Sequence, residues 1–147
     1  MVKESPLQPS NSPNITSEQL LSLAHQARKN AYAPYSHYLV GACILTDQGN
    51  TYTGVNVENR SYGATVCAER TAIGAMITAG EYKILKIAVD TGDGGFPCGI
   101  CLQSIAEFAV SRELCTIIVQ AADGMKELSL TDLAPNLWTS DKVQPKL

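Results

Sequence analysis

The sequence has no cluster of basic residues, and this absence limits the partners that the protein can bind. Its 147 residues contain 11 lysines and arginines against 14 aspartates and glutamates, a net charge of −3. A polynucleotide-binding protein needs a basic stripe to contact phosphates. We therefore expect no nucleic-acid partner and a small, free substrate.

Long apolar runs and an export signal are missing as well. No apolar run approaches the ~20 residues that a membrane helix requires, and residues 1–6 lack the charged and apolar blocks of a signal peptide. We expect no membrane partner and a cytoplasmic location. In that reducing compartment, cysteine spacing indicates metal binding or catalysis before disulfides.

The length suits one domain with a substantial core. Residues 1–14 are rich in Ser, Pro, Asn and Gln, and we expect a disordered N-terminal tail there. A single domain is predicted over residues 15–140, followed by a C-terminal tail at 141–147.

The first half of the chain predicts two helices separated by a hairpin. Thr16 is followed three residues later by Gln19, the spacing of a capping box, and apolar residues continue at helical spacing to Ala31, before Pro34. Residues 38–46 and 51–57 are predicted strands of a hairpin. A second helix is predicted to open at residue 65 or 66, with Cys67 in its first turn, and to end at Gly80.

The second half alternates strands and helices. We expect strands at 84–90 and 115–120, a helix beginning at 97–98, and a short helix at 128–133. These patterns locate four strands in all. An α/β fold accommodates the order, with a mixed sheet between helices and parallel pairing after the hairpin.

Three of the five cysteines have the spacing of a zinc site. Cys67, Cys98 and Cys101 can provide three corners of a tetrahedron and leave the fourth open. Glu69 follows the first cysteine by two residues, close enough to move protons without being a ligand. The remaining cysteines, Cys43 and Cys115, are expected to be buried thiols.

This pattern is typical of zinc deaminases of nucleobases, in which a Glu follows the first ligand by two residues and Pro-Cys-x-x-Cys follows later. Zinc lowers the pKa of bound water towards ~7, and Glu69 would transfer protons. Three thiolates donate much negative charge, so compensation is needed. Helix N-termini at Cys67 and Cys98 favour anionic sulfur, and we expect Arg70 to donate hydrogen bonds to the thiolates.

A structural zinc site is the alternative. It would need a fourth ligand from Cys43, Cys115 or His37. None of these belongs to a second C-x-x-C pair, and Glu69 would then have no purpose. We therefore favour an open, catalytic site.

Over residues 16–138 the chain resembles the small, homotetrameric cytidine deaminases. Residues 33–42 are similar to the family's Pro-Tyr-Ser-x-Phe-x-Val-Gly-Ala stretch, and residues 54–62 to its nucleoside-binding segment. Residues 67–70 and 97–101 correspond to its zinc motifs. Several stretches in the right order make the resemblance specific.

The resemblance implies a three-layer α-β-α sandwich with a five-stranded mixed sheet and one zinc ion per subunit. It implies a hydrolase that converts free cytidine and deoxycytidine to uridine and deoxyuridine with release of ammonia, in pyrimidine salvage. It also implies a homotetramer with its sites at subunit interfaces.

The family's substrate contacts fall on six residues of this sequence. Asn56 and Glu58 would bind ribose hydroxyls, and the Ala68 N–H would bind the base carbonyl. The other three would be Tyr38, lining the pocket, Tyr62, reaching into a neighbouring subunit's site, and Trp138, where the family tends to place a Phe that covers the base. The simpler interpretation of Asn56 and Glu58 is that they are polar residues exposed at the end of a strand. For Tyr38 and Trp138 the simpler interpretation is ordinary packing.

Three substitutions depart from the family pattern. Leu102 stands where Arg is usual, which removes a cation beside the thiolates. Tyr38 replaces Phe and adds a hydroxyl that needs a partner near the sugar or base. Trp138 replaces Phe and would reshape the cover of the base. We expect catalysis to survive with an altered rate or substrate preference.

Two other functions remain open at this stage. The first is deamination of a cytosine-nucleoside antibiotic such as blasticidin S, against which residues 56–59 argue because they indicate a ribose. The second is a catalytically weak, nucleoside-binding paralogue, against which the intact Glu69 argues. Polynucleotide editing is the least favoured activity.

Overall fold

Five strands form one mixed sheet in the computed structural model, which describes residues 14–139. The strand order is β2-β1-β3-β4-β5. The β3–β4 pair is parallel and the other pairs are antiparallel. The strands are β1 Gly41–Thr46, β2 Thr51–Val55, β3 Ile84–Asp90, β4 Thr116–Ala121 and β5 Gly124–Ser129. Except for Asn14, the tails predicted at 1–14 and 141–147 lie outside the described residues, and the domain boundaries remain predictions.

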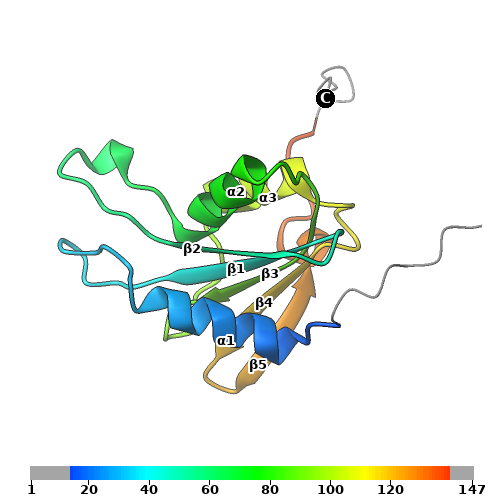
Figure 1. The fold of residues 1–147 in the computed structure, drawn as a ribbon, viewed down its shortest axis with the longest axis horizontal. Coiled ribbons are helices and arrows are strands. Elements are labelled where there is room, and N and C mark those ends of the chain that lie inside the picture. The colour runs from blue at the N-terminus through cyan, green and yellow to red at the C-terminus, as the bar shows by residue number, and fades with distance from the viewer. Residues whose placement is uncertain (1–13, 140–147) are drawn as a thin grey trace, which may run out of the picture.

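Helices cover both faces of the sheet (Figure 1), which confirms the predicted three-layer α/β fold. Helix α1 (Ser17–Arg28) packs on one face, whereas α2 (Ala68–Thr78) and α3 (Gly99–Phe108) pack on the other. A short 3-10 helix, η1 (Tyr62–Ala64), precedes α2, and α4 (Leu130–Leu133) follows β5.

The strands supply both cores because successive side chains of a strand point to opposite faces. In β1, Ala42 and Ile44 belong to the core under α2 and α3. Cys43 and Leu45 belong to the core under α1. All six residues of β1 are buried, as expected for a central strand with helices on both sides.

The capping box at Thr16 and Gln19 is confirmed, since both of its hydrogen bonds are present. However, α1 ends at Arg28, before the predicted Ala31. The N–H of Ala31 bonds the carbonyl of Arg28, three residues back, so the last turn tightens. The next residue, Tyr32, turns away to bond the Asn56 carbonyl at 3.0 Å.

Strand β5 is the strand that the sequence patterns missed. It includes residues 128 and 129, so the short helix predicted at 128–133 begins only at Leu130. Strand β5 pairs with β4 along one edge of the sheet. Its sequence lacks a clear apolar alternation, and Lys126 and Glu127 are exposed. Charged residues are common on edge strands because they discourage pairing with other chains.

Two loops project from the same end of the sheet (Figure 1): the α1–β1 loop and the β2–α2 loop that contains η1. They meet where Tyr35 packs edge-on against Tyr62, with ring centroids 6.0 Å apart. The Glu58 carboxylate also accepts a hydrogen bond from the Tyr35 N–H at 2.8 Å. These two loops border the site described below.

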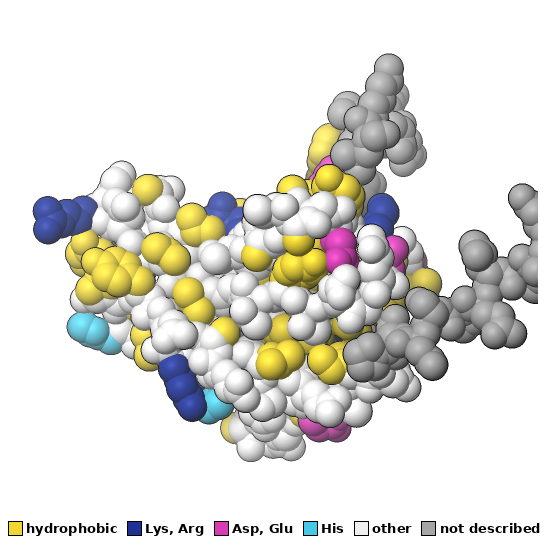
Figure 2. Space-filling model, in the orientation of Figure 1, with side chains coloured by type: hydrophobic (Ala, Val, Ile, Leu, Met, Phe, Trp, Pro, Cys, Tyr) yellow, Lys and Arg dark blue, Asp and Glu magenta, His cyan; other side chains and the backbone are white. Residues whose placement is uncertain are grey.

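No helix in the described part of the chain combines the length and apolarity needed to cross a membrane. On the face drawn in Figure 2, basic side chains lie apart from one another and form no stripe.

Candidate active site

Helices α2 and α3 bring the three predicted zinc ligands together. Cys67 is the N-cap of α2 and Cys98 is the N-cap of α3, while Cys101 lies in the first turn of α3. Their sulfur atoms lie within 4.8 Å of one another. Cys67 therefore precedes the first helical turn, whereas the sequence predicted it inside that turn.

The three thiols fit zinc in number, chemistry and spacing. Zn–S bonds of about 2.3 Å in a tetrahedron place sulfur atoms about 3.8 Å apart, so the observed cluster needs only a small contraction. Within residues 14–139 no fourth metal-binding side chain joins the cluster. Cys43 and Cys115 are buried in the two cores, and burial raises the pKa of each thiol to about 12. The described residues therefore fit an open coordination position.

Helix geometry assists the exposed ligand. Partial burial acts to raise the pKa of the Cys98 thiol. Hydrogen bonds outweigh this effect and lower the pKa, and they include bonds from the backbone of Cys101 and Ile100. Burial raises the pKa of the Cys67 thiol. The N-terminus of α3 thus provides the compensation predicted for one of the three thiols.

Glu69 lies in the first turn of α2, beside the thiol cluster. Its side chain is buried, with a residue exposure of 4%. Burial raises the pKa of its carboxyl above the ordinary value. A carboxyl of this kind suits a group that accepts and returns a proton.

A cavity of about 300 Å³ joins Glu69 to the predicted substrate-binding residues. Seven of the predicted site residues line it: Tyr38, Asn56, Glu58, Cys67, Ala68, Glu69 and Cys98. A nucleobase and its sugar are of the size that such a pocket encloses.

The side chains of Asn56 and Glu58 form hydrogen bonds with residues 35–40 and so stabilise the wall of the cavity. The Asn56 side chain accepts from the Val40 N–H at 2.9 Å and donates to the Tyr38 carbonyl at 2.8 Å. The Glu58 carboxylate accepts from the backbone and hydroxyl of Ser36, as well as from Tyr35. Because the side chain of Asn56 binds residues 38–40, regular strand pairing begins at Gly41, later than the predicted residue 38.

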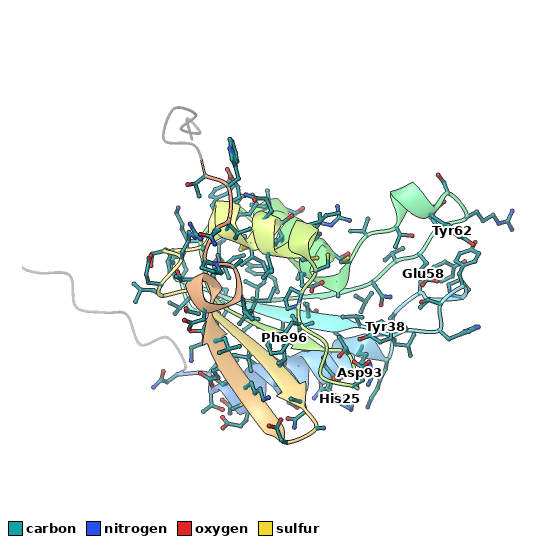
Figure 3. All side chains as sticks on the ribbon, turned by 180° about the vertical axis from the view of Figure 1, so that it is seen from behind. His25, Tyr38, Glu58, Tyr62, Asp93 and Phe96 are labelled. Atoms are coloured by element: carbon teal, nitrogen blue, oxygen red, sulfur yellow. The ribbon has the colours of Figure 1, made fainter. Side chains whose placement is uncertain are left out.

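The Tyr38 hydroxyl has a partner that the sequence did not indicate. It donates to Asp93 Oδ1 at 2.8 Å, in the loop between β3 and α3. Figure 3 shows Tyr38 and Asp93 near each other at the end of the sheet from which the two loops project. The Tyr38 hydroxyl was expected to need a hydrogen-bond partner near the sugar or base, and Asp93 of the protein provides one.

Apart from Cys101, which belongs to the thiol cluster, three predicted site residues do not line this cavity in the single chain. Tyr62 is 77% exposed on the projecting loop (Figure 3). Trp138 is 71% exposed and lines a separate surface hollow of about 500 Å³, together with Arg70 and Gln103. The Arg70 guanidinium donates to the Thr65 carbonyl at 3.2 Å, and its buried Nε has no partner, so the predicted hydrogen bonds to the thiolates are not formed.

Sequence patterns also missed several residues that line the cavity. Thr91 and Phe96 form part of its wall, at the two ends of the loop before Cys98. For Phe96, its position next to the Pro97-Cys98 motif is the sequence signal that could have indicated a place in the cavity wall. Ser36, Val40, Thr65 and Val66 complete the lining.

Comparison with known proteins agrees with this geometry. The family model for the cytidine and deoxycytidylate deaminase zinc-binding region matches residues 14–117. A cytidine deaminase of Sporosarcina psychrophila is 35% identical over 126 residues, covering 84% of this chain and 92% of that protein. A probable cytidine deaminase of Dictyostelium discoideum is 42% identical over 132 residues, covering 88% of each chain.

A solved structure extends the similarity to three dimensions. The crystal structure of cytidine deaminase from Burkholderia pseudomallei superposes with a TM-score of 0.76 at 36% identity, covering 84% of this chain and 99% of that one. With its thiol cluster, its buried glutamate and these matches over most of its length, the chain belongs to the zinc-binding cytidine deaminase family.

Proposed function

We propose that the protein is a zinc-dependent hydrolase that deaminates free cytidine and deoxycytidine to uridine and deoxyuridine, releasing ammonia. The observation that carries this proposal is the position of Glu69, buried at the wall of a nucleoside-sized cavity that also contains Cys67 and Cys98. The relatives described above, which are named cytidine deaminases, support it further.

Cys67, Cys98 and Cys101 would hold one zinc ion per subunit. Zinc in this position lowers the pKa of water and so makes a nucleophile available at neutral pH. Glu69 accepts one proton of the attacking water and passes it to the ring nitrogen while the water oxygen bonds to the ring carbon. It then passes the second proton, from the hydroxyl so formed, to the amino group, and the C–N bond breaks to give the carbonyl and ammonia. Its burial favours this role because a carboxyl with a raised pKa exchanges protons readily near neutral pH.

The remaining lining residues hold the nucleoside. The Ala68 N–H donates to the base carbonyl, and it is available because the first N–H groups of a helix have no partner within the helix. Asn56 and Glu58 contact the ribose hydroxyls. Asn56 retains unused capacity, since its amide offers more sites than the two hydrogen bonds described above occupy.

We further propose that the protein is a homotetramer with sites at subunit interfaces. The exposed Tyr62 and its edge contact with Tyr35 support this, because a projecting aromatic pair suits insertion into a neighbouring subunit. Trp138, which is exposed and outside its own cavity, would then cover the base in a neighbouring site. A cytoplasmic role in pyrimidine salvage is consistent with free nucleosides as substrates.

Ultraviolet monitoring of the purified protein with cytidine, deoxycytidine and blasticidin S tests the proposal. We expect turnover of both nucleosides, with ammonia released in equal amount. Turnover of blasticidin S alone would support the antibiotic deaminase, and bound zinc without any turnover would support the weak paralogue. Neither alternative gains support from the relatives above.

A further inference from the structure

Asp93 organises the loop that connects β3 to the second zinc motif. One of its carboxylate oxygens, Oδ1, accepts hydrogen bonds from the Tyr38 hydroxyl at 2.8 Å, from Thr91 Oγ1 at 2.7 Å and from the Gly95 N–H at 3.2 Å. The Gly95 N–H also donates to Thr91 Oγ1 at 2.8 Å. Of these donors only Tyr38 lies outside the loop, so it fastens the loop to the segment before β1.

The electrostatics agree with this arrangement. Hydrogen bonds from Thr91 and then Tyr38 lower the pKa of the Asp93 carboxyl. Burial raises the pKa of the Tyr38 hydroxyl. The pair therefore remains a neutral hydroxyl donating to a carboxylate, the stronger kind of hydrogen bond.

The loop backbone also rests directly against the end of the tyrosine ring. A Cβ atom added to Gly95 would lie 2.8 Å from the Tyr38 hydroxyl oxygen. Only a glycine permits this approach without displacing the hydroxyl. The close approach of Gly95 and the hydrogen bond to Asp93 therefore hold the same two segments together: the loop before α3 and the segment before β1.

This loop provides part of the cavity wall. Thr91 and Phe96 line the cavity at the two ends of the loop, and Cys98 follows Phe96 by two residues. Asp93 itself does not line the cavity, so any effect it has on substrate must act through its neighbours. In Figure 3, Phe96 lies further towards the middle of the sheet than Tyr38 and Asp93.

We propose that Asp93 is a positioning residue, which holds Tyr38 and Phe96 in the wall of the substrate pocket through its hydrogen bond to the Tyr38 hydroxyl. Phe96 presents an apolar ring to the bound nucleoside, and the tether keeps that ring in place. The inference rests on the proposed function for the identity of the substrate. The tether itself concerns only this chain's own contacts.

A double-mutant cycle tests the proposal with Tyr38→Phe, Asp93→Ala and the combined variant. Loss of one hydrogen bond to a charged acceptor at this exposed position is expected to raise KM for cytidine about 3- to 10-fold, with kcat within about twofold. If the two residues act through one bond, KM of the combined variant equals that of Asp93→Ala alone. Effects on KM that multiply, or a loss confined to kcat, would overturn the proposal.

The matched control is Tyr52→Phe. Tyr52 donates to the Glu81 carboxylate at 2.7 Å, a bond of the same kind in a part of the molecule outside the cavity. Its removal is expected to leave KM and kcat unchanged. If Tyr52→Phe raised KM as much as Tyr38→Phe does, loss of any tyrosine–carboxylate hydrogen bond would be enough to raise KM. The specific role of Asp93 would then be rejected.

Hydrogen exchange measured by mass spectrometry separates the tether from the proposed function. In Tyr38→Phe and Asp93→Ala, amides of residues 91–96 are expected to exchange at least about threefold faster, whereas Tyr52→Phe matches the wild type. Unchanged exchange in both loop variants would overturn the tether whatever the activity. An inactive wild type with faster loop exchange in the variants would instead reject the function and keep the tether.

Discussion

Cys67 and Cys98 occupy the same structural position, since each is the residue immediately before the first turn of a helix, and their sulfur atoms lie within 4.8 Å of each other. Two helix N-termini therefore converge on one point. This convergence places partial positive charge where anionic sulfur gathers. Of these two cysteines, Cys98 gains from the arrangement, since the pKa of its thiol is lowered, whereas burial raises the pKa of the Cys67 thiol.

Zinc content should depend on these cysteines and not on the buried ones. Cys98→Ala is expected to lower bound zinc from about one ion per chain to below about 0.2, because two thiolates alone hold zinc weakly. Cys115→Ala is the control, since its thiol is buried in the core away from the cluster. Elemental analysis of both purified variants checks this, and full zinc occupancy in Cys98→Ala would contradict the ligand assignment.

Glu58 should affect substrate binding more than chemistry. Glu58→Gln weakens a charge-assisted hydrogen bond to the sugar, so KM for cytidine is expected to rise about 10-fold with kcat within about twofold. Steady-state kinetics measure both constants. Glu127→Gln, on the exposed edge strand, is the control and should leave KM unchanged. A KM for Glu58→Gln equal to that of the wild type would remove Glu58 from the ribose site.

A cation at position 102 should strengthen the zinc site. Leu102 is half-buried against the core beneath α2 and α3, and Arg70 bonds a backbone carbonyl instead of the thiols. Leu102→Arg is expected to slow zinc transfer to a chelator about 3- to 10-fold, because a nearby cation stabilises thiolate. Leu102→Gln controls for the lost apolar contact. Equal zinc release and turnover in all three proteins would show the charge argument to be wrong.

The close approach of α2 to β2 at Gly54 should be essential to the site. A Cβ at Gly54 would lie 2.3 Å from the Ala72 nitrogen and 2.4 Å from the Ala68 oxygen. Gly54→Ala is expected to lower the free energy of unfolding by about 3 kcal/mol and to reduce zinc content, because α2 must move. Denaturant titration measures the loss of stability.

The control for Gly54 is Gly74→Ala in the same helix. A Cβ there meets nothing within 4 Å. Replacing an exposed helical glycine with alanine is expected to raise stability by about 0.5–1 kcal/mol. If Gly54→Ala were as stable as Gly74→Ala, the packing described here would not hold.

The sequence predicted the elements that carry the zinc motifs because those signals are local. The capping box at Thr16, strand β3 and the helix that opens at Cys98 depend on neighbours a few residues apart. The ends of α1 and β1 were placed less well. Their limits depend on Asn56, whose backbone and side chain bond residues 32, 38 and 40 from a distant part of the sequence.

The predicted substrate contacts came from the family resemblance. Neither the resemblance nor the sequence patterns indicated the Tyr38–Asp93 hydrogen bond. These residues are 55 positions apart and meet only because β1 and β3 are neighbours in the sheet. Gly92-Asp93-Gly94-Gly95 indicates only a turn from its sequence. A long-range pair of this kind has no local pattern, so only the folded chain reveals it.

In the proposed reaction Glu69 transfers the proton while the three cysteines hold zinc. The most direct test is the kcat for cytidine of Glu69→Gln, which keeps the size of the side chain, measured together with zinc content. We predict full zinc occupancy and a kcat lower by about 10³-fold, within the range for loss of a general acid–base group. A kcat within about tenfold of the wild type, at equal zinc content, would show that Glu69 is not the group that transfers the proton.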